Sequence, residues 1–263
     1  MAIVSRRPAF HVFEYNLLSY RRSFRSSLFS SFIQPVLFLA AMGLGLGGIV
    51  DRSGAHASLG GVSYLTFLAP GLLAAAGMQV AFSEGTYPVY SAIHWIRTYF
   101  AMTATPVSPR AIAIGQIAFI AFRLAMVTGI FSLVMLAFGV QGSAGGFVLG
   151  WLAAILTGLA FATPIVAYSA TTNTEGSFNA LFRFGMTPLF LFSGSFFPID
   201  RLPGFLQPIA ALTPLYHGVA LARGFALGTF EPSAAVVHVA YLAVVAAVGC
   251  VLCLIAYERR LVT

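Results

Sequence analysis

Long apolar stretches recur along this chain, and they restrict the folds open to it more than any other feature. Five of them are long enough to cross a lipid bilayer as a helix, which takes roughly 20 apolar residues. With a shorter sixth, they occupy about 28–50, 62–83, 111–138, 147–170, 181–198 and 234–257. Charged residues make up only 8% of the 263 residues, whereas soluble domains carry about 25%. The sequence therefore predicts an all-α integral membrane protein with six transmembrane helices.

All 14 basic residues are arginines, and their positions predict how the chain is oriented. With six spans and the N-terminus in the cytoplasm, ten of them fall on the cytoplasmic side or at its interface. Only Arg52, Arg201 and Arg223 would then lie outside, and Arg123 falls within a span. Because basic residues are retained on the cytoplasmic side of membranes, we expect both termini to be cytoplasmic.

Residues 1–27 precede the first span and are expected to form a cytoplasmic arm followed by an interfacial amphipathic helix. The arm carries Arg6 and Arg7. Large apolar residues then recur at helical spacing on one face: Phe10, Phe13, Leu17, Tyr20 and Phe24. Such a helix lies in the membrane interface with its apolar face in the lipid. The alternative is a simple basic flank, and residues 28–263 form the transmembrane domain in either case.

The segment at about 199–230 is too apolar for an ordinary loop and too rich in proline for a spanning helix. Pro203, Pro208 and Pro214 each remove a backbone donor and break a helix, so the pieces between them are too short to cross. A seventh span here would also place the C-terminal arginines outside. We therefore expect a re-entrant helical hairpin on the extracellular side, between spans five and six. The alternative is a loop lying flat on the membrane.

Residues 84–110 form the longest segment expected in the cytoplasm. Val89, Ile93, Ile96 and Phe100 mark one face of a short amphipathic helix. This helix either docks a soluble partner or rests on the membrane.

Arg123 is the one basic residue expected inside the membrane. A central arginine costs about 2.5–3.5 kcal/mol on insertion scales. It either snorkels or pairs with a neighbouring helix, or it faces a cavity and contacts a substrate.

The sequence lacks the residue patterns that nucleotide binding, metal binding and catalysis require. The chain contains no lysine, so it has no P-loop for nucleotide phosphates. The histidines lack metal-ligand spacing, and the Cys250-x-x-Cys253 pair lies in an apolar run. We expect no catalytic site, no metal and no bound cofactor, and the scattered arginines do not indicate a nucleic-acid partner. Glu84 and Arg123 are the only candidates for an ion-coupled carrier.

The stretch LFSGSFFPIDRLPGFLQPIAALTPLYHGVALARG, residues 191–224, resembles a motif of the permease subunits of type-2 ABC exporters. A second stretch, YLTFLAPGLLAAAGMQVAFSEGT with TPVSPRAIAIGQI after it, resembles the branch that contains the nodulation lipo-oligosaccharide and daunorubicin-type drug exporters. The residues that match the first motif are Ser193, Gly194, Pro198, Leu202, Pro203, Pro214, Arg223 and Gly224.

The resemblance implies a function in the bacterial cytoplasmic membrane. ATP and Mg²⁺ would be bound by a separate P-loop ATPase subunit, present in two copies, and the permease would pair with an identical or homologous permease. By alternating access, the complex would export an amphipathic substrate that is lipid-like, drug-like or a lipid-linked glycan. The hairpin would cap the outer side of the path. Contact with the ATPase would involve residues near 88–102, with transmission through Glu84, Arg97, Thr105 and Pro106. The alternatives are an independent or ion-coupled carrier and a membrane-embedded lipid-modifying enzyme.

Overall fold

The computed structural model describes residues 8–22, 24–52, 61–140 and 143–262. Within these ranges the chain forms helices and turns and no β-strand, so the predicted all-α class is confirmed. The predicted arm with Arg6 and Arg7 lies outside the described residues. Among the described residues, five helices are long and apolar enough to cross a membrane: Ser31–Val50, Tyr64–His94, Pro109–Ala137, Ala144–Thr171 and Pro232–Leu261.

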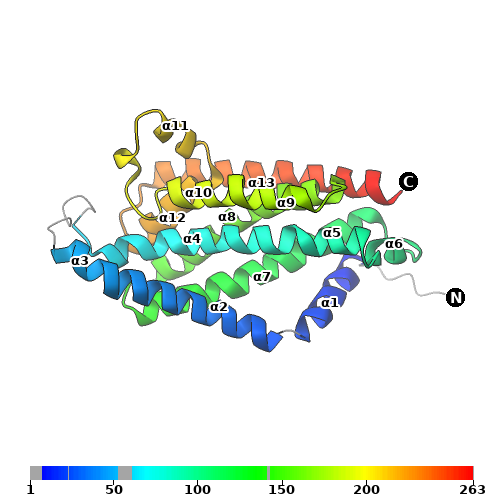
Figure 1. Ribbon diagram of the computed structural model, residues 1–263, viewed down its shortest axis with the longest axis horizontal. Coiled ribbons are helices and arrows are strands. Elements are labelled where there is room, and N and C mark those ends of the chain that lie inside the picture. The colour runs from blue at the N-terminus through cyan, green and yellow to red at the C-terminus, as the bar shows by residue number, and fades with distance from the viewer. Residues whose placement is uncertain (1–7, 23, 53–60, 141–142, 263) are drawn as a thin grey trace.

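The N-terminal part has an angled helix followed by a long helical run. Helix α1 (Pro8–Arg21) lies against α7 (Pro109–Ala137) and buries Val12 and Tyr20. The long run that follows contains a π-helical section in its glycine-rich middle, and it consists of α2 (Phe24–Leu39), η1 (Ala40–Leu46) and α3 (Gly47–Arg52). Figure 1 shows α1 turned sharply away from the direction of α2.

The interior of the bundle is formed by α4 (Tyr64–Gly85) and α8 (Ala144–Thr171), with α7 beside them; α13 (Pro232–Leu261) packs against α8 and is largely exposed. Helix α8 packs against α4, α7 and α13. The α4–α8 crossing is close because Gly77 has no side chain: a Cβ there would lie 2.5 Å from the carbonyl oxygen of Ala154. Small residues at such crossings allow membrane helices to pack backbone to backbone.

Two short helices connect α4 to α7 at the end of the bundle that also carries the C-terminus (Figure 1). Helix α5 (Tyr87–His94) continues α4 after a bend, and α6 (Thr98–Thr103) follows a reversal of the chain. The reversal is at Arg97, whose φ of 56° places it in the left-handed region. Ser108 then caps α7, accepting a hydrogen bond from the amide of Ala111.

The predicted fifth span corresponds to a helical run of 17 residues made of α9 (Gly176–Ala180), η3 (Leu181–Met186) and α10 (Thr187–Phe192). At 1.5 Å per residue the run is about 25 Å long. It ends six residues before the expected boundary at 198, because the backbone turns at Gly194, where φ is +83°. Apolar composition continues past this turn, which is why composition alone placed the boundary later. The count of six spans stays a prediction.

The proline-rich segment folds at the opposite end of the bundle from α6 (Figure 1). It contains the short η4 (Ile199–Arg201), α11 (Leu206–Ala211) and α12 (Pro214–Leu227). Helix α11 stands out from the bundle, whereas α12 returns into it and packs against α4, α8 and α13. Two helices of unequal length therefore occupy the predicted hairpin region at about 199–230.

Candidate functional site

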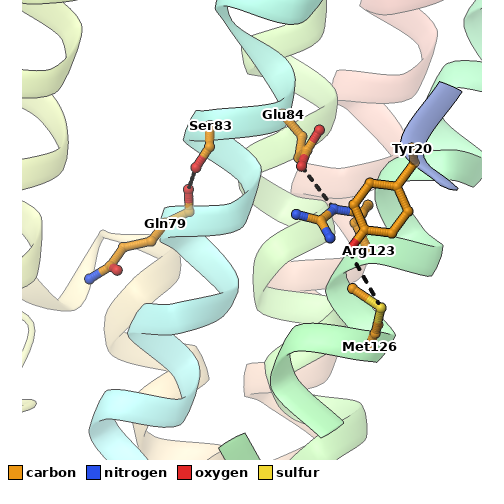
Figure 2. Close-up of polar contacts among 6 residues, drawn as sticks. All are labelled: Tyr20, Gln79, Ser83, Glu84, Arg123 and Met126. Carbon is orange, nitrogen blue, oxygen red and sulfur yellow. Dashed lines mark hydrogen bonds and ion pairs between the residues drawn. The ribbon is translucent and has the colours of Figure 1, made fainter. Parts of the chain in front are cut away.

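An ion pair inside the bundle joins two residues for which the sequence suggested separate roles. Arg123 lies in the middle of α7, and Glu84 lies one residue before the end of α4. Arg123 Nε donates a hydrogen bond to Glu84 Oε1 at 2.9 Å (Figure 2). The side chains are only 11% and 18% exposed. The two charges therefore compensate each other within the helical bundle.

Tyr20 of α1 covers the arginine from a third helix. The Arg123 Cζ atom lies 4.2 Å from the centre of the Tyr20 ring, within the range of a cation–π interaction. Figure 2 shows the Arg123 guanidinium between the Glu84 carboxylate and this ring. Arg123 Nη1 is buried and has no hydrogen-bond partner among the described residues. Leaving a buried donor unpaired costs about 1–3 kcal/mol, so this nitrogen is a candidate contact for a ligand.

A pocket of about 260 Å³, here called the polar pocket, lies on one side of Arg123. Its polar lining comes from α2, α4 and α7 and consists of Ser31, Gln34, Gln79, Ser83 and Arg123. The amides of Gln34 and Gln79 approach each other at 3.5 Å across the pocket. Ser83 donates a hydrogen bond to the backbone carbonyl of Gln79 at 2.6 Å, as Figure 2 shows. Hydrogen-bonding groups thus line a cavity between helices of membrane-spanning length.

A second pocket of about 420 Å³, here called the entry pocket, lies between α1, α5, α6 and α7, and Arg123 lines it as well. Its wall includes a hydrogen-bonded cluster in which Gln116 Oε1 accepts from Asn16 Nδ2 at 2.9 Å and from Tyr99 Oη at 3.1 Å. Tyr99 is buried in α6, and this burial raises its pKa. Arg123 therefore contributes to the lining of both pockets.

The turn between α5 and α6 exposes apolar residues on a rigid support. Trp95 and Ile96 are 57% and 73% exposed, and Arg97 beside them is exposed too; residues 95–97 are called the tip below. Behind it, His94 stacks on Tyr90 with ring centres 4.2 Å apart. The same imidazole has Nε2 3.0 Å from the guanidinium of Arg260 on α13 and 3.2 Å from the carbonyl oxygen of Thr172, after α8. One ring nitrogen either accepts from Arg260 or donates to the Thr172 carbonyl, so His94 ties the tip to the end of α13 or to the end of α8, depending on its tautomer.

Arg223 of α12 fastens the hairpin to the bundle. Its Nε donates to the carbonyl of Phe67 at 3.1 Å, and its Nη2 donates to the carbonyl of Gly194 at 2.9 Å. The guanidinium also lies 3.7 Å from the centre of the Phe67 ring. One side chain thus joins α12, α4 and the turn after α10.

Comparison with known proteins assigns this arrangement to a family. Residues 9–227 match the family model described as ABC-2 type transporter. The chain belongs to the ABC-2 type transporter family. It is 31% identical to nodulation protein J of Rhizobium leguminosarum bv. viciae over 259 residues, which cover 95% of this chain and 93% of the relative. The nodulation protein J of Bradyrhizobium diazoefficiens is 29% identical over 257 residues, 95% of this chain and 92% of the relative. The predicted resemblance to the type-2 permeases is therefore confirmed.

In this ABC-2 permease the residues expected to transmit movement fall into two places. Arg97, Thr105 and Pro106 are exposed at the α5–α6 end, where the hydroxyl of Thr105 donates to the carbonyl of Met102 at 2.6 Å. Glu84 lies deeper, in the ion pair with Arg123.

The residues of the hairpin motif are also spread over more than one contact. Ser193 and Gly194 form the turn that Arg223 contacts, and the Ser193 hydroxyl lies 2.8 Å from that of Ser195. The other residues of the motif lie between α10 and the end of α12. Pro198, Leu202 and Pro203 precede α11, Pro214 is the first residue of α12, and Gly224 packs against Phe230.

Sequence reasoning missed a pair of histidines in this permease. His217 of α12 and His238 of α13 have their Nδ1 atoms 2.7 Å apart, and Tyr241 stacks on His217 with ring centres 3.9 Å apart. The two are 21 residues apart in sequence, so spacing did not suggest a contact. No group of three or more His, Cys, Asp or Glu side chains gathers within the part of the chain that the structure describes. The two histidines therefore connect α12 of the hairpin to α13, the last long helix.

Proposed function

We propose that this chain is the permease subunit of an ATP-driven ABC exporter in the bacterial cytoplasmic membrane. It would move an amphipathic, lipid-like or drug-like substrate, or a lipid-linked glycan, from the cytoplasmic side outward by alternating access. ATP and Mg²⁺ would be bound by two copies of a separate P-loop ATPase, and a second permease, identical or homologous, would complete the path. Membership of the ABC-2 family supports this proposal.

The observation that carries the proposal is the tip. Two large apolar side chains at the end of a bundle, on a turn that is fixed by His94, gain nothing from exposure to water. Aromatic residues and arginine are enriched in protein–protein interfaces, and the tip exposes both Trp95 and Arg97. With the termini in the cytoplasm, as the arginine distribution predicts, the tip faces the compartment where an ATPase is available.

The connection from the tip to the membrane supports a mechanical role. Helix α5 continues α4, so a push on the tip acts along a helix that carries Glu84 and, further on, Gln79. In this mechanism, ATP-driven closure of the ATPases shifts α5 and α4 together. The shift changes the surroundings of Arg123, which lines both pockets.

A single substitution tests the tip. Changing Ile96 to Asp places a charge in the proposed apolar contact and is expected to reduce the ATPase recovered with tagged permease at least tenfold. Val262 at the same end of the bundle is 74% exposed, so Val262→Asp is a matched control that leaves recovery unchanged. The measurement is purification from native membranes in mild detergent, with quantitative mass spectrometry of the proteins that accompany the permease.

Two results would contradict the proposal. If Ile96→Asp recovers as much ATPase as the unaltered chain does, the tip is not part of the contact with the ATPase. Transport by the purified chain alone in liposomes, driven by a proton gradient and abolished by Glu84→Gln, would instead identify an ion-coupled carrier.

A further inference from the structure

We propose that His217 and His238 form an acid-sensitive latch, which holds the hairpin helix α12 against α13 and opens when the extracellular side becomes acidic. The inference goes beyond the proposed function, because it concerns when the hairpin is free to move, whatever substrate the exporter carries. It uses only the predicted extracellular position of the hairpin. The latch consists of the two imidazoles, and the rings of Tyr216 and Tyr241 contact them.

The two imidazoles can keep their contact only while one of the facing nitrogens carries no proton. Nδ1 of His217 lies 2.7 Å from Nδ1 of His238, so one nitrogen donates and the other accepts. A first added proton binds Nε2 of the donating ring and leaves this hydrogen bond in place. A second proton puts an N–H on both facing nitrogens and a positive charge on both rings. Like charges this close repel each other, so the contact has to open.

The surroundings of the pair do not stabilise two charges. His217 is only 9% exposed, so water solvates its charged form poorly. Tyr241 stacks on His217, and Tyr216 lies edge-on to both imidazoles. His238 lines a pocket of about 340 Å³ together with Arg223, which adds a further positive charge. Glu231 lines the same pocket, but it is exposed, and solvent screens its charge.

The helices that pack against the latch bring no acid to it. Helix α8 packs against both α12 and α13, and neither α8 nor α11 contains an acidic, basic or histidine residue. Helix α4 contacts α12 at Phe67, and its one acid, Glu84, lies 17 residues further on in the ion pair with Arg123. The second proton on the pair is therefore uncompensated.

Opening the latch would free one side of α12 and leave the other side fastened. Arg223, six residues after His217, stays bound to the carbonyls of Phe67 and Gly194. With the imidazoles apart, the first turns of α12 would move away from α13 about this anchor. Histidine changes charge between about pH 5 and pH 8, so mild acidification outside the cell is sufficient to loosen the hairpin.

Cysteine reactivity tests the latch on the complete permease–ATPase complex in phosphatidylcholine nanodiscs. Ala235 of α13 is half-buried and packs against an apolar cluster that includes Leu221 of α12. In a background without Cys250 and Cys253, the Ala235→Cys variant reacts with an impermeant thiol reagent. Its rate is divided by that of the Ser233→Cys variant, whose position is exposed, so that the effect of pH on the thiol itself cancels. The ratio should rise roughly tenfold between about pH 7.5 and pH 5, because the reaction of a buried site follows the population of its open form.

Two glutamine variants and one control identify the histidines as the cause. His217→Gln and His238→Gln each place an uncharged amide beside the remaining imidazole, and an amide can both donate and accept. Each variant should therefore keep a low ratio at both pH values. His11→Gln is the matched control, because His11 lies on α1 with its side chain 54% exposed, and this variant should respond to pH as the unaltered chain does.

Three results would overturn the latch. These are a ratio that does not change with pH in the unaltered chain, a rise that persists in both glutamine variants, and, in intact cells, a response that requires an acidified cytoplasm instead of an acidified medium. The ATPase recovered with the permease is measured in the same preparations. A missing pH response with the ATPase bound refutes this inference alone. If no ATPase accompanies the permease, the exporter proposal fails, and the same ratio measured on the permease alone still decides for or against the latch.

Discussion

Removing the carboxylate of Glu84 should destabilise this protein strongly, because the charge of Arg123 would stay buried without compensation. Breaking one partner out of a buried ion pair typically costs about 3–5 kcal/mol. Both side chains are less than a fifth exposed, so little of that cost is relieved by water. In Glu84→Gln the amide oxygen can still accept from Arg123 Nε, which places the expected loss near the lower limit, at about 3 kcal/mol.

Thermal unfolding of the purified protein provides the measurement. A loss of 1 kcal/mol lowers the melting temperature of a chain of this size by about 2–4 °C, so Glu84→Gln should melt about 6–12 °C below the unaltered chain. Arg123→Gln should cost a similar amount, because it leaves the carboxylate unpaired. The double variant carries neither charge at this position and should recover most of the loss. This double-mutant cycle separates the charge interaction from the effect of each side chain's shape.

The exposed ion pair between Arg110 and Glu258 provides the control. Solvent screens such a pair, so Glu258→Gln should leave the melting temperature within experimental error. If Glu84→Gln shifts the melting temperature no more than Glu258→Gln does, the pair is not desolvated and the argument is wrong. A double variant that melts as low as the single variants would show that packing, rather than charge, causes the loss.

Two further substitutions test the helix packing and the hairpin. Gly77→Ala places a Cβ 2.5 Å from the backbone carbonyl oxygen of Ala154 and should lower the stability by about 1–3 kcal/mol through overpacking. Gly145 has open space around it, so Gly145→Ala should leave the melting temperature unchanged. Equal melting temperatures for the two variants would refute the close crossing of α4 and α8. Arg223→Gln removes the guanidinium that fastens the hairpin to the bundle. In a background without other cysteines, a cysteine placed at Leu206 should then react faster with an impermeant thiol reagent added outside cells. Unchanged labelling, or labelling only from the cytoplasm, would argue against the re-entrant hairpin.

Hydrophobicity located the long helices because the bilayer thickness fixes how many apolar residues a span needs. The span expected at 147–170 is found as Ala144–Thr171, and that expected at 234–257 as Pro232–Leu261. The stretch at 181–198 differs because a single backbone torsion at Gly194 ends the helix while the sequence stays apolar. Composition carries no information about such a torsion unless the glycine is recognised as a turn residue.

The sequence identified Glu84 and Arg123 singly but did not predict that they pair. Their contact depends on how α4 and α7 are rotated about their own axes. The two residues are 39 positions apart in the sequence, and the sequence alone does not show that rotation. Depth did not suggest the contact either, because the sequence places Glu84 just past the span 62–83 and Arg123 about 18 Å into the span 111–138, counting 1.5 Å per residue. In the structure α5 continues α4, so Glu84 lies about 15 Å from the end of α5 and Arg123 about 21 Å from the start of α7. Two opposite charges at similar depth between apolar helices have few partners other than each other.

Helix α4 contributes residues to the hairpin anchor, to the polar pocket and to the buried ion pair. Near its start the carbonyl of Phe67 receives the guanidinium of Arg223 from the hairpin, further on Gln79 lines the polar pocket, and Glu84 pairs with Arg123 before α5 leads to the tip. Two points interrupt this helix: Pro70, which lies between Phe67 and Gln79, removes a backbone hydrogen bond, and Thr86 separates α4 from α5. A displacement at the proposed ATPase contact would therefore reach Glu84 and Gln79 across the bend at Thr86. The hairpin anchor at Phe67 lies beyond Pro70, where a helix can kink, so we expect the pocket to respond to the tip more directly than the hairpin does.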